Sequence, residues 1–142
     1  MTEGQFQILV VDDDPGMRDL LCGILSDEGF PVTAVADEPA AMEKIATGAF
    51  SLVIMDIRLA QGQDGRAIVQ WARKTQPTLK SLYISGGPGG LPFDPDLDGF
   101  ISKPFKPREV IGCVWELYYR GPRRGLDRQE QTEETAVGQD TP

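Results

Sequence analysis

The chain has 142 residues, of which 40% are hydrophobic and 25% are charged, and its formal net charge is −8. This length suits one compact domain that buries a core without disulfides or a structural metal, and this composition is typical of globular chains rather than disordered or membrane ones. The acidic balance disfavours general binding to nucleic acids or membrane surfaces, because their phosphates would be repelled. We therefore expect no direct contact with nucleic acid or membrane.

The sequence contains no histidine, and its two cysteines are isolated from each other. Catalytic triads, the common zinc sites and a phosphohistidine donor within the chain are thereby excluded. The longest apolar runs have only the length of a β-strand, and the N-terminus lacks the basic region and apolar run of a secretory signal. We expect a cytoplasmic location.

Strand-like and helix-like patterns alternate over the first 120 residues. An apolar run over residues 7–11 predicts a buried strand, and Asp14 with Pro15 predicts the start of a helix that ends near Gly29. Further short apolar runs predict four more strands, over residues 32–35, 52–55, 81–85 and 100–102. Three more helices are predicted, over residues 39–48, 64–74 and 107–119. Such alternation is typical of an α/β fold with a parallel sheet covered on both faces.

Two segments have neither pattern. Residues 86–95 hold four glycines and three prolines, which are too many helix breakers for a helix. Residues 121–142 are polar with few apolar side chains, and we expect them to form a disordered C-terminal tail. The expected organisation is therefore one folded domain over residues 1–120 followed by a tail over residues 121–142.

Polar residues follow the predicted strands at the point where each strand ends. Asp12 and Asp13 come after the first strand and Asp56 after the third, while Ser85 and Lys103 come at the ends of the fourth and fifth. In an open parallel sheet, ligands bind at the carboxyl ends of the strands. Three carboxylates at one edge repel each other unless a hard cation such as Mg²⁺ lies among them. A carboxylate beside a metal ion and an ammonium group is equipped to accept a phosphoryl group.

These residues resemble the receiver domain of two-component response regulators, over roughly residues 5–120. The matching stretches are ILVVDDDP (8–15), LVIMDIRL (52–59), LYISGG (82–87) and GFISKPF (99–105). Each stretch is weak alone, but together they are highly specific. The resemblance implies a flavodoxin-like, doubly wound five-stranded parallel sheet in the order 2-1-3-4-5. The segment rich in glycine and proline indicates that the helix between the fourth and fifth strands is reduced or absent.

The resemblance also implies a role for each polar residue at the strand ends. Asp56 would be the phosphoacceptor. Asp12 and Asp13 would hold Mg²⁺ together with Asp56 and the backbone carbonyl of Arg58.

Four residues at the ends of the last two strands complete the implied site. Ser85 and Lys103 would each bind a phosphoryl oxygen, Ser85 through its hydroxyl and Lys103 through its ammonium. Phe100 would be the switch aromatic, which moves inward when Ser85 is drawn to the phosphate. Lys103-Pro104 matches the position at which the family has a cis peptide bond, and proline makes that isomer inexpensive.

The function implied by the resemblance is that of a stand-alone receiver. It would take a phosphoryl group from a sensor histidine kinase or a histidine phosphotransfer protein and signal through contact with a downstream protein. The donor would be a separate molecule, because the chain has no histidine. The chain would not be an enzyme in the usual sense, since it would catalyse only its own Mg²⁺-dependent phosphorylation and dephosphorylation. The 22 residues after residue 120 are too few and too polar for a DNA-binding output domain.

Three alternatives remain, because a fold alone does not define a function. A flavodoxin-like cofactor binder is opposed by the acids after the first strand, where a flavin phosphate needs backbone donors and hydroxyls. An aspartyl phosphatase usually needs a second acid two residues after the nucleophile, where this chain has Arg58. A receiver-like adaptor that works without phosphate is disfavoured because every chemical position is present.

Overall fold

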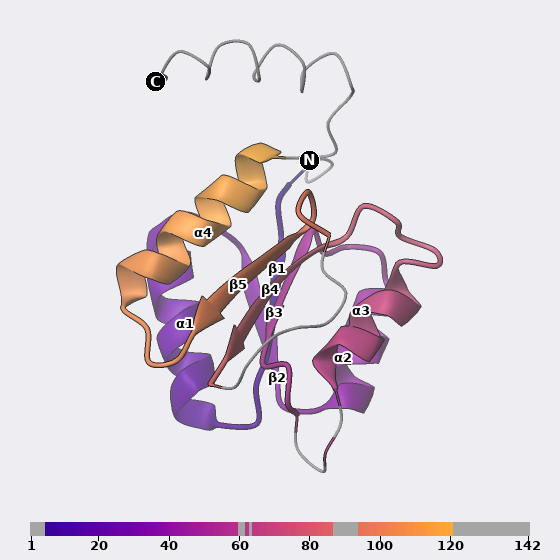
Figure 1. Ribbon diagram of the computed structural model, residues 1–142, viewed down its shortest axis with the longest axis horizontal. Coiled ribbons are helices and arrows are strands. Elements are labelled where there is room, and N and C mark those ends of the chain that lie inside the picture. The colour runs from indigo at the N-terminus through magenta and orange to yellow at the C-terminus, as the bar shows by residue number, and fades with distance from the viewer. Residues whose placement is uncertain (1–4, 60–61, 63, 87–93, 121–142) are drawn as a thin grey trace.

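The computed structural model describes residues 5–59, 62, 64–86 and 94–120. The helices and strands formed by these residues are β1 (Ile8–Val11), α1 (Pro15–Asp27), β2 (Val32–Val35), α2 (Glu38–Ala46), β3 (Leu52–Met55), α3 (Gly65–Ala72), β4 (Lys80–Ser85), β5 (Asp98–Ser102) and α4 (Pro107–Arg120). The strands form one parallel sheet in the order β2-β1-β3-β4-β5. The predicted doubly wound sheet and its strand order are thus confirmed (Figure 1).

Helices cover both faces of the sheet, with α1 and α4 on one face and α2 and α3 on the other (Figure 1). Successive side chains of a strand point to opposite faces, so a strand covered on both sides is apolar throughout. In β1, Ile8 and Val10 belong to the core cluster beside α1 and α4, whereas Leu9 and Val11 belong to the cluster beside α2 and α3. This two-sided burial explains why the strands appear in the sequence as continuous apolar runs.

The first three helices each begin at an aspartate that caps the exposed backbone N–H groups of the first turn. The Oδ1 atoms of Asp14, Asp37 and Asp64 accept the N–H groups of Gly16, Ala40 and Arg66, respectively. The predicted role of Asp14 as a helix cap is confirmed. The ends of α1 and α2 are followed by Gly29 and Gly48, which have φ values of +97° and +77° that other residues rarely adopt.

The connection between β4 and β5 has no helix among its described residues. Residues 87–93, which carry most of the predicted helix breakers, lie outside the described part of the chain, as does the predicted tail over residues 121–142. Strand β5 begins at Asp98, two residues earlier than predicted, because Asp98 pairs with Ser81 of β4. No helix in the described ranges is both long and apolar enough to cross a membrane.

A buried polar group, here called the Asp98 cluster, lies where β4 and β5 begin. The carboxylate of Asp98, which is 4% exposed, accepts hydrogen bonds from Arg73 Nη2 at 2.7 Å and from Ser81 Oγ at 2.6 Å. Its other oxygen accepts the backbone N–H of Asp94 at 2.7 Å, and Arg73 Nε donates to the carbonyl of Leu79 at 2.9 Å. The cluster therefore joins the end of α3 to the starts of both strands.

Candidate functional site

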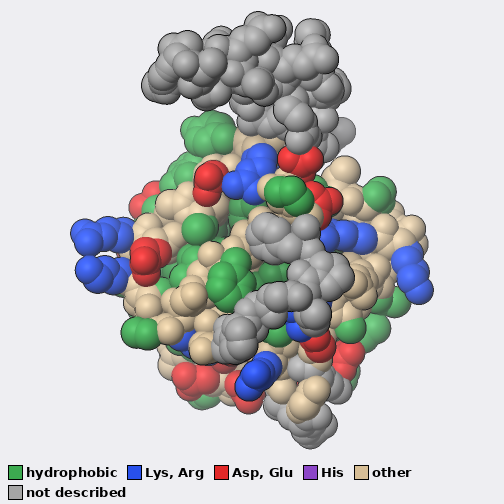
Figure 2. Space-filling view, viewed as in Figure 1, with side chains coloured by type: hydrophobic (Ala, Val, Ile, Leu, Met, Phe, Trp, Pro, Cys, Tyr) green, Lys and Arg blue, Asp and Glu red, His purple; other side chains and the backbone are tan. Residues whose placement is uncertain are grey.

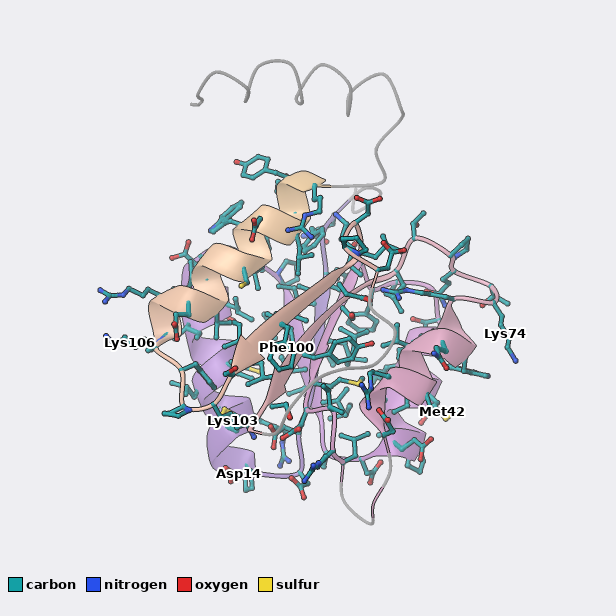
Figure 3. All side chains as sticks on the ribbon, in the orientation of Figure 1. Asp14, Met42, Lys74, Phe100, Lys103 and Lys106 are labelled. Atoms are coloured by element: carbon teal, nitrogen blue, oxygen red, sulfur yellow. The ribbon has the colours of Figure 1, made fainter. Side chains whose placement is uncertain are left out.

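The predicted site residues lie at the carboxyl ends of four neighbouring strands. Asp12 and Asp56 directly follow β1 and β3, Ser85 is the last residue of β4, and Lys103 directly follows β5. Figure 3 shows Lys103 and Asp14 at the same lower end of the sheet. In the space-filling view, acidic side chains gather along this lower edge with basic ones among them (Figure 2). The fold thus brings residues from four separate parts of the sequence to one charged edge.

Asp56 and Lys103 form an ion pair at the centre of this edge. Lys103 Nζ lies 2.8 Å from Asp56 Oδ2, and Asp56 Oδ1 accepts the backbone N–H of Arg58 at 2.9 Å. The hydrogen bond to Asp56 is the main cause of a raised pKa of Lys103, which keeps its ammonium positive at neutral pH. The two side chains are 21% and 35% exposed, so the pair is accessible from solvent.

Asp12 is a partly buried carboxylate at this edge. Partial burial raises its pKa above the usual value; the N–H of Asp14 and the charge of Lys103 act in the opposite direction. The charges of Asp13 and Asp56 raise the pKa of Asp12 further, so both of these carboxylates repel Asp12. The charge of Lys103 also interacts with Asp56, Asp12 and Asp13, all of which raise its pKa.

The chemistry of these donors fits a hard divalent cation. Among the described residues, no three acidic or thiol side chains are already arranged as a metal-binding group. Mg²⁺ prefers carboxylate and carbonyl oxygens and keeps several of its waters, so it needs only a few protein ligands. Asp12, Asp13 and Asp56, with the carbonyl of Arg58, supply ligands of this kind, and Mg²⁺ would relieve their mutual repulsion.

Ser85, Phe100 and Pro104 complete the residues predicted for the site. Ser85 is buried at 3% exposure, and its carbonyl accepts the N–H of Lys103 at 2.9 Å, which holds the ends of β4 and β5 together. Phe100 is 36% exposed on the edge strand, opposite Tyr83 of β4 (Figure 3). The peptide bond between Lys103 and Pro104 is cis.

A cavity of about 470 Å³ lies beside the loop that follows Asp56 and is lined by Arg58, Arg66 and Ser85 among others. Two hydrogen bonds from Arg66 to Asp64, at 3.0 and 2.8 Å, hold its guanidinium in place, and they are the main cause of a raised pKa of Arg66. Because Asp64 also lines the cavity and balances the charge of Arg66, the net positive charge of the lining comes from Arg58, close to Asp56 in the sequence.

Two residues at the site were missed by the sequence analysis. Arg18 of α1 donates from Nη1 to the backbone carbonyl of Asp12 at 2.8 Å. Gly65 begins α3 so close to β3 that a Cβ there would lie 2.6 Å from the carbonyl oxygen of Asp56. Neither contact has a signal in the sequence, because each depends on how a helix packs against the end of a strand.

Fold and site together define a flavodoxin-like α/β protein with a charged site at the carboxyl edge of its sheet. The model of the response regulator receiver domain family matches residues 8–114. The chain belongs to this family, whose members are signalling domains of two-component systems rather than conventional enzymes.

The curated relatives include proteins of different lengths. The chain is 31% identical over 116 residues to the response regulator receiver protein CpdR of Brucella abortus, covering 78% of this chain and 95% of CpdR. It is 29% identical over 119 residues to the DNA-binding response regulator MtrA of Mycolicibacterium smegmatis, covering 76% of this chain and 48% of MtrA. The chain thus spans nearly all of CpdR but only about half of MtrA.

The chain is also similar to solved structures of response regulator proteins. A response regulator receiver protein from Sinorhizobium medicae is similar with a TM-score of 0.70 and 32% identity, covering 80% of this chain and 94% of that one. A chain in the crystal structure of the histidine kinase ThkA in complex with the response regulator protein TrrA is similar with a TM-score of 0.67 and 28% identity. That similarity covers 80% of this chain and 98% of the other.

Proposed function

We propose that this receiver domain accepts a phosphoryl group on Asp56, with Mg²⁺ bound, and signals by contact with a downstream protein. The observation that carries the proposal is the 2.8 Å contact between Lys103 Nζ and Asp56 Oδ2 at an accessible edge that holds two further carboxylates. A structural ion pair would not need those additional acids, because they repel one another without adding a favourable contact.

Asp56 would act as the nucleophile. Its carboxylate oxygen attacks the phosphorus of the donor, the bond from phosphorus to the donor's imidazole nitrogen breaks, and the electron pair of that bond stays on the nitrogen. Lys103 would then move its hydrogen bond to a phosphoryl oxygen, and Ser85 would bind another. Their role is to hold charge at fixed places, since phosphoryl transfer depends mainly on positioning and electrostatic stabilisation.

Asp12, Asp13 and the carbonyl of Arg58 would hold Mg²⁺ beside Asp56. When bound, the metal would neutralise charge on the phosphoryl oxygens. The described carboxylates support this assignment through their chemistry and their mutual repulsion.

The proposed switch involves Ser85 and Phe100. Ser85 is buried at the end of β4, whereas Phe100 lies partly exposed on the neighbouring strand. When Ser85 binds the phosphoryl group, the ring of Phe100 would move inward and change the surface offered to a partner. Because phenylalanine lacks a hydroxyl, packing alone would stabilise the inward position.

The donor would be a histidine kinase or a histidine phosphotransfer protein. Receiver domains pair with histidine kinases, as in the complex of ThkA with TrrA, and this chain is similar to a chain of that complex. The cytoplasmic location expected from the sequence is part of the same proposal. The cavity beside Asp56, with Arg58 and Arg66 in its lining, would admit the phosphorylated end of the donor.

Intact-protein mass spectrometry tests the proposal after incubation with acetyl phosphate, with and without Mg²⁺. We expect one phosphate adduct that needs Mg²⁺ and that is lost in Asp56→Ala. Asp14→Asn is the matched control, because it removes a carboxylate close to the site while keeping a good helix cap.

A missing adduct would have two different meanings. If beryllofluoride, a stable phosphate mimic, still bound in an Asp56-dependent manner, the phosphoryl group would be accepted but lost quickly. If neither ligand bound, the proposal would be wrong and the adaptor that works without phosphate would be favoured.

A further inference from the structure

Arg18 contacts the backbone of the predicted metal ligand Asp12 from a different element. It lies in the first turns of α1, is half-buried, and donates from Nη1 to the carbonyl oxygen of Asp12 at 2.8 Å. Its own backbone N–H donates to the carbonyl of Asp14 at 3.0 Å as part of the helix. Arg18 therefore donates hydrogen bonds to the first and the last residue of the short acidic loop between β1 and α1.

The hydrogen bond from Arg18 constrains both acids of the predicted metal site. The carbonyl of Asp12 belongs to the planar peptide unit that joins Asp12 to Asp13, so a hydrogen bond that holds this carbonyl also holds the orientation of the whole peptide plane, from which both side chains leave. Two other polar atoms of Asp12 are also hydrogen-bonded. Its N–H donates to the carbonyl of Val35 at 3.1 Å, and its Oδ1 accepts the N–H of Asp14 at 2.9 Å.

We propose that Arg18 is a positioning residue for the divalent cation: it holds the peptide between Asp12 and Asp13 so that both carboxylates face the metal. This inference rests on the proposed function, because it assumes that these acids bind Mg²⁺. Arg18 touches neither Asp56 nor Lys103 in any recorded hydrogen bond or ion pair of the described residues. It acts through Asp12.

The charge of Arg18 makes the proposal sharply testable. A positive charge near a metal site weakens cation binding by simple Coulomb repulsion, so its removal alone would tighten the binding of Mg²⁺. A positioning role predicts the opposite result, because the carbonyl of Asp12 loses its donor and the acids lose their alignment. The sign of the change in affinity therefore separates the two roles.

Isothermal titration calorimetry with Mg²⁺ alone is the direct measurement, on the full chain and on Arg18→Met, Arg18→Lys and Lys106→Met. We expect Arg18→Met to weaken binding about 3- to 10-fold, which is the range for loss of one hydrogen bond. Arg18→Lys keeps the charge and a donor and should recover most of the affinity. Lys106→Met removes one exposed charge three residues after Lys103 and should bind at least as tightly as the native chain.

Phosphorylation by acetyl phosphate gives an independent readout. In Arg18→Met, the Mg²⁺ concentration for half-maximal rate should rise, while the rate at saturating Mg²⁺ should stay close to that of the native chain. A general loss of structure would instead lower the maximal rate and the unfolding midpoint.

The outcomes distinguish this inference from the proposed function. Unchanged or tighter binding of Mg²⁺ by Arg18→Met would overturn the positioning role and leave the phosphoacceptor intact. If the native chain bound no Mg²⁺, both ideas would be wrong. If Arg18→Met failed to fold, Arg18→Gln would take its place, because it also removes the charge and the guanidinium bond to Asp12. Weaker binding of Mg²⁺ by Arg18→Gln would support the positioning role, and unchanged or tighter binding would overturn it.

Discussion

Two ion pairs at opposite ends of the same sheet differ in burial, and the more exposed pair is the one to which we assign the proposed chemistry. At the amino end of β5, Arg73 and Asp98 are 2.7 Å apart, and Asp98 is 4% exposed with three hydrogen-bond donors around its carboxylate. At the carboxyl end, Lys103 and Asp56 are 2.8 Å apart but are 35% and 21% exposed. The two ion pairs have similar lengths. They differ in the number of charges around them and in the access of water to them.

Negative charge is neutralised in the Asp98 cluster, whereas it is in excess at the carboxyl edge of the sheet. In the Asp98 cluster, one guanidinium and two neutral donors satisfy one carboxylate. At the functional edge, Asp12 and Asp13 form no ion pair with a described residue and raise the electrostatic cost of the folded state. This excess of negative charge fits the binding of Mg²⁺ that we propose for these acids.

The largest expected effect on stability is in the Asp98 cluster. Asp98→Ala removes the buried carboxylate and leaves Arg73, whose side chain is 19% exposed, without its partner. Loss of one partner of a buried ion pair typically costs about 3–5 kcal/mol of the free energy of unfolding. Urea unfolding followed by circular dichroism measures this change. The double variant Arg73→Met with Asp98→Ala should recover part of the loss, and a loss below about 1 kcal/mol in Asp98→Ala would remove the distinction between the two clusters.

A smaller effect is expected for Gly65→Ala, which tests how closely the acceptor is packed. Its Cβ would lie 2.6 Å from both the carbonyl oxygen of Asp56 and Met55 Sδ, so β3 or α3 must shift. We expect a loss of about 1–3 kcal/mol in unfolding free energy, together with slower phosphorylation by acetyl phosphate. Gly23→Ala is the control, because a Cβ there meets nothing within 4 Å and alanine favours the helix. Equal phosphorylation rates in both variants would contradict the close packing.

Asp64→Ala should have a still smaller effect, since this residue is partly exposed. The variant loses the cap of α3 and the partner of Arg66. We expect loss of the cap alone to lower the free energy of unfolding by about 1 kcal/mol. Arg66 lowers the pKa of Asp64 below its usual value of 3.8. The charged carboxylate therefore adds to the stability of the folded protein, and this contribution is fully present above pH 3.8. It is lost as the pH falls through the lowered pKa.

Urea midpoints of Asp64→Ala and Asp64→Asn at pH 7 and pH 3 separate these two contributions. Asparagine keeps a cap but not the charge, so Asp64→Asn should lie between Asp64→Ala and the native chain at pH 7. A difference between the native chain and Asp64→Asn that did not shrink at low pH would contradict the ion-pair contribution.

The smallest effect on stability should be at Asp12, and it should have the opposite sign. The pKa of Asp12 is raised in the folded protein, so the folded state binds its proton more tightly than the unfolded chain does. The charged carboxylate therefore lowers stability at pH values above its folded pKa, and this penalty disappears as the pH falls through that pKa.

Asp12→Asn should accordingly raise the urea midpoint slightly at pH 7 while it abolishes Mg²⁺-dependent phosphorylation. The midpoints of the variant and the native chain should converge at acidic pH. Asp14→Asn serves again as the neighbouring control, with little change in either property. A clear loss of stability in Asp12→Asn at pH 7 would show that this acid has a structural role after all.

Much of the fold was readable from local patterns. Strands β1 and β3 are uninterrupted apolar runs between turn residues, and Asp14 with Pro15 marks the start of α1. The start of β5 was missed because Asp98 is a charged residue and resembled a loop position. Its burial depends on Arg73, which lies 25 residues earlier in the sequence.

The sequence by itself determined the strands apart from the start of β5, the gathering of the polar residues at one edge of the sheet and the chemical type of each predicted ligand. The order of the strands along that edge was implied by the resemblance to the family. This was possible because the carboxyl ends of parallel strands meet at one edge, so a residue directly after an apolar run has a predictable place. The tertiary structure alone decided that Lys103 contacts Asp56, that Arg18 reaches the carbonyl of Asp12 and that Gly65 presses on the acceptor strand. The last two contacts depend on the position of a packed helix relative to the end of a strand, which no local pattern of residues encodes.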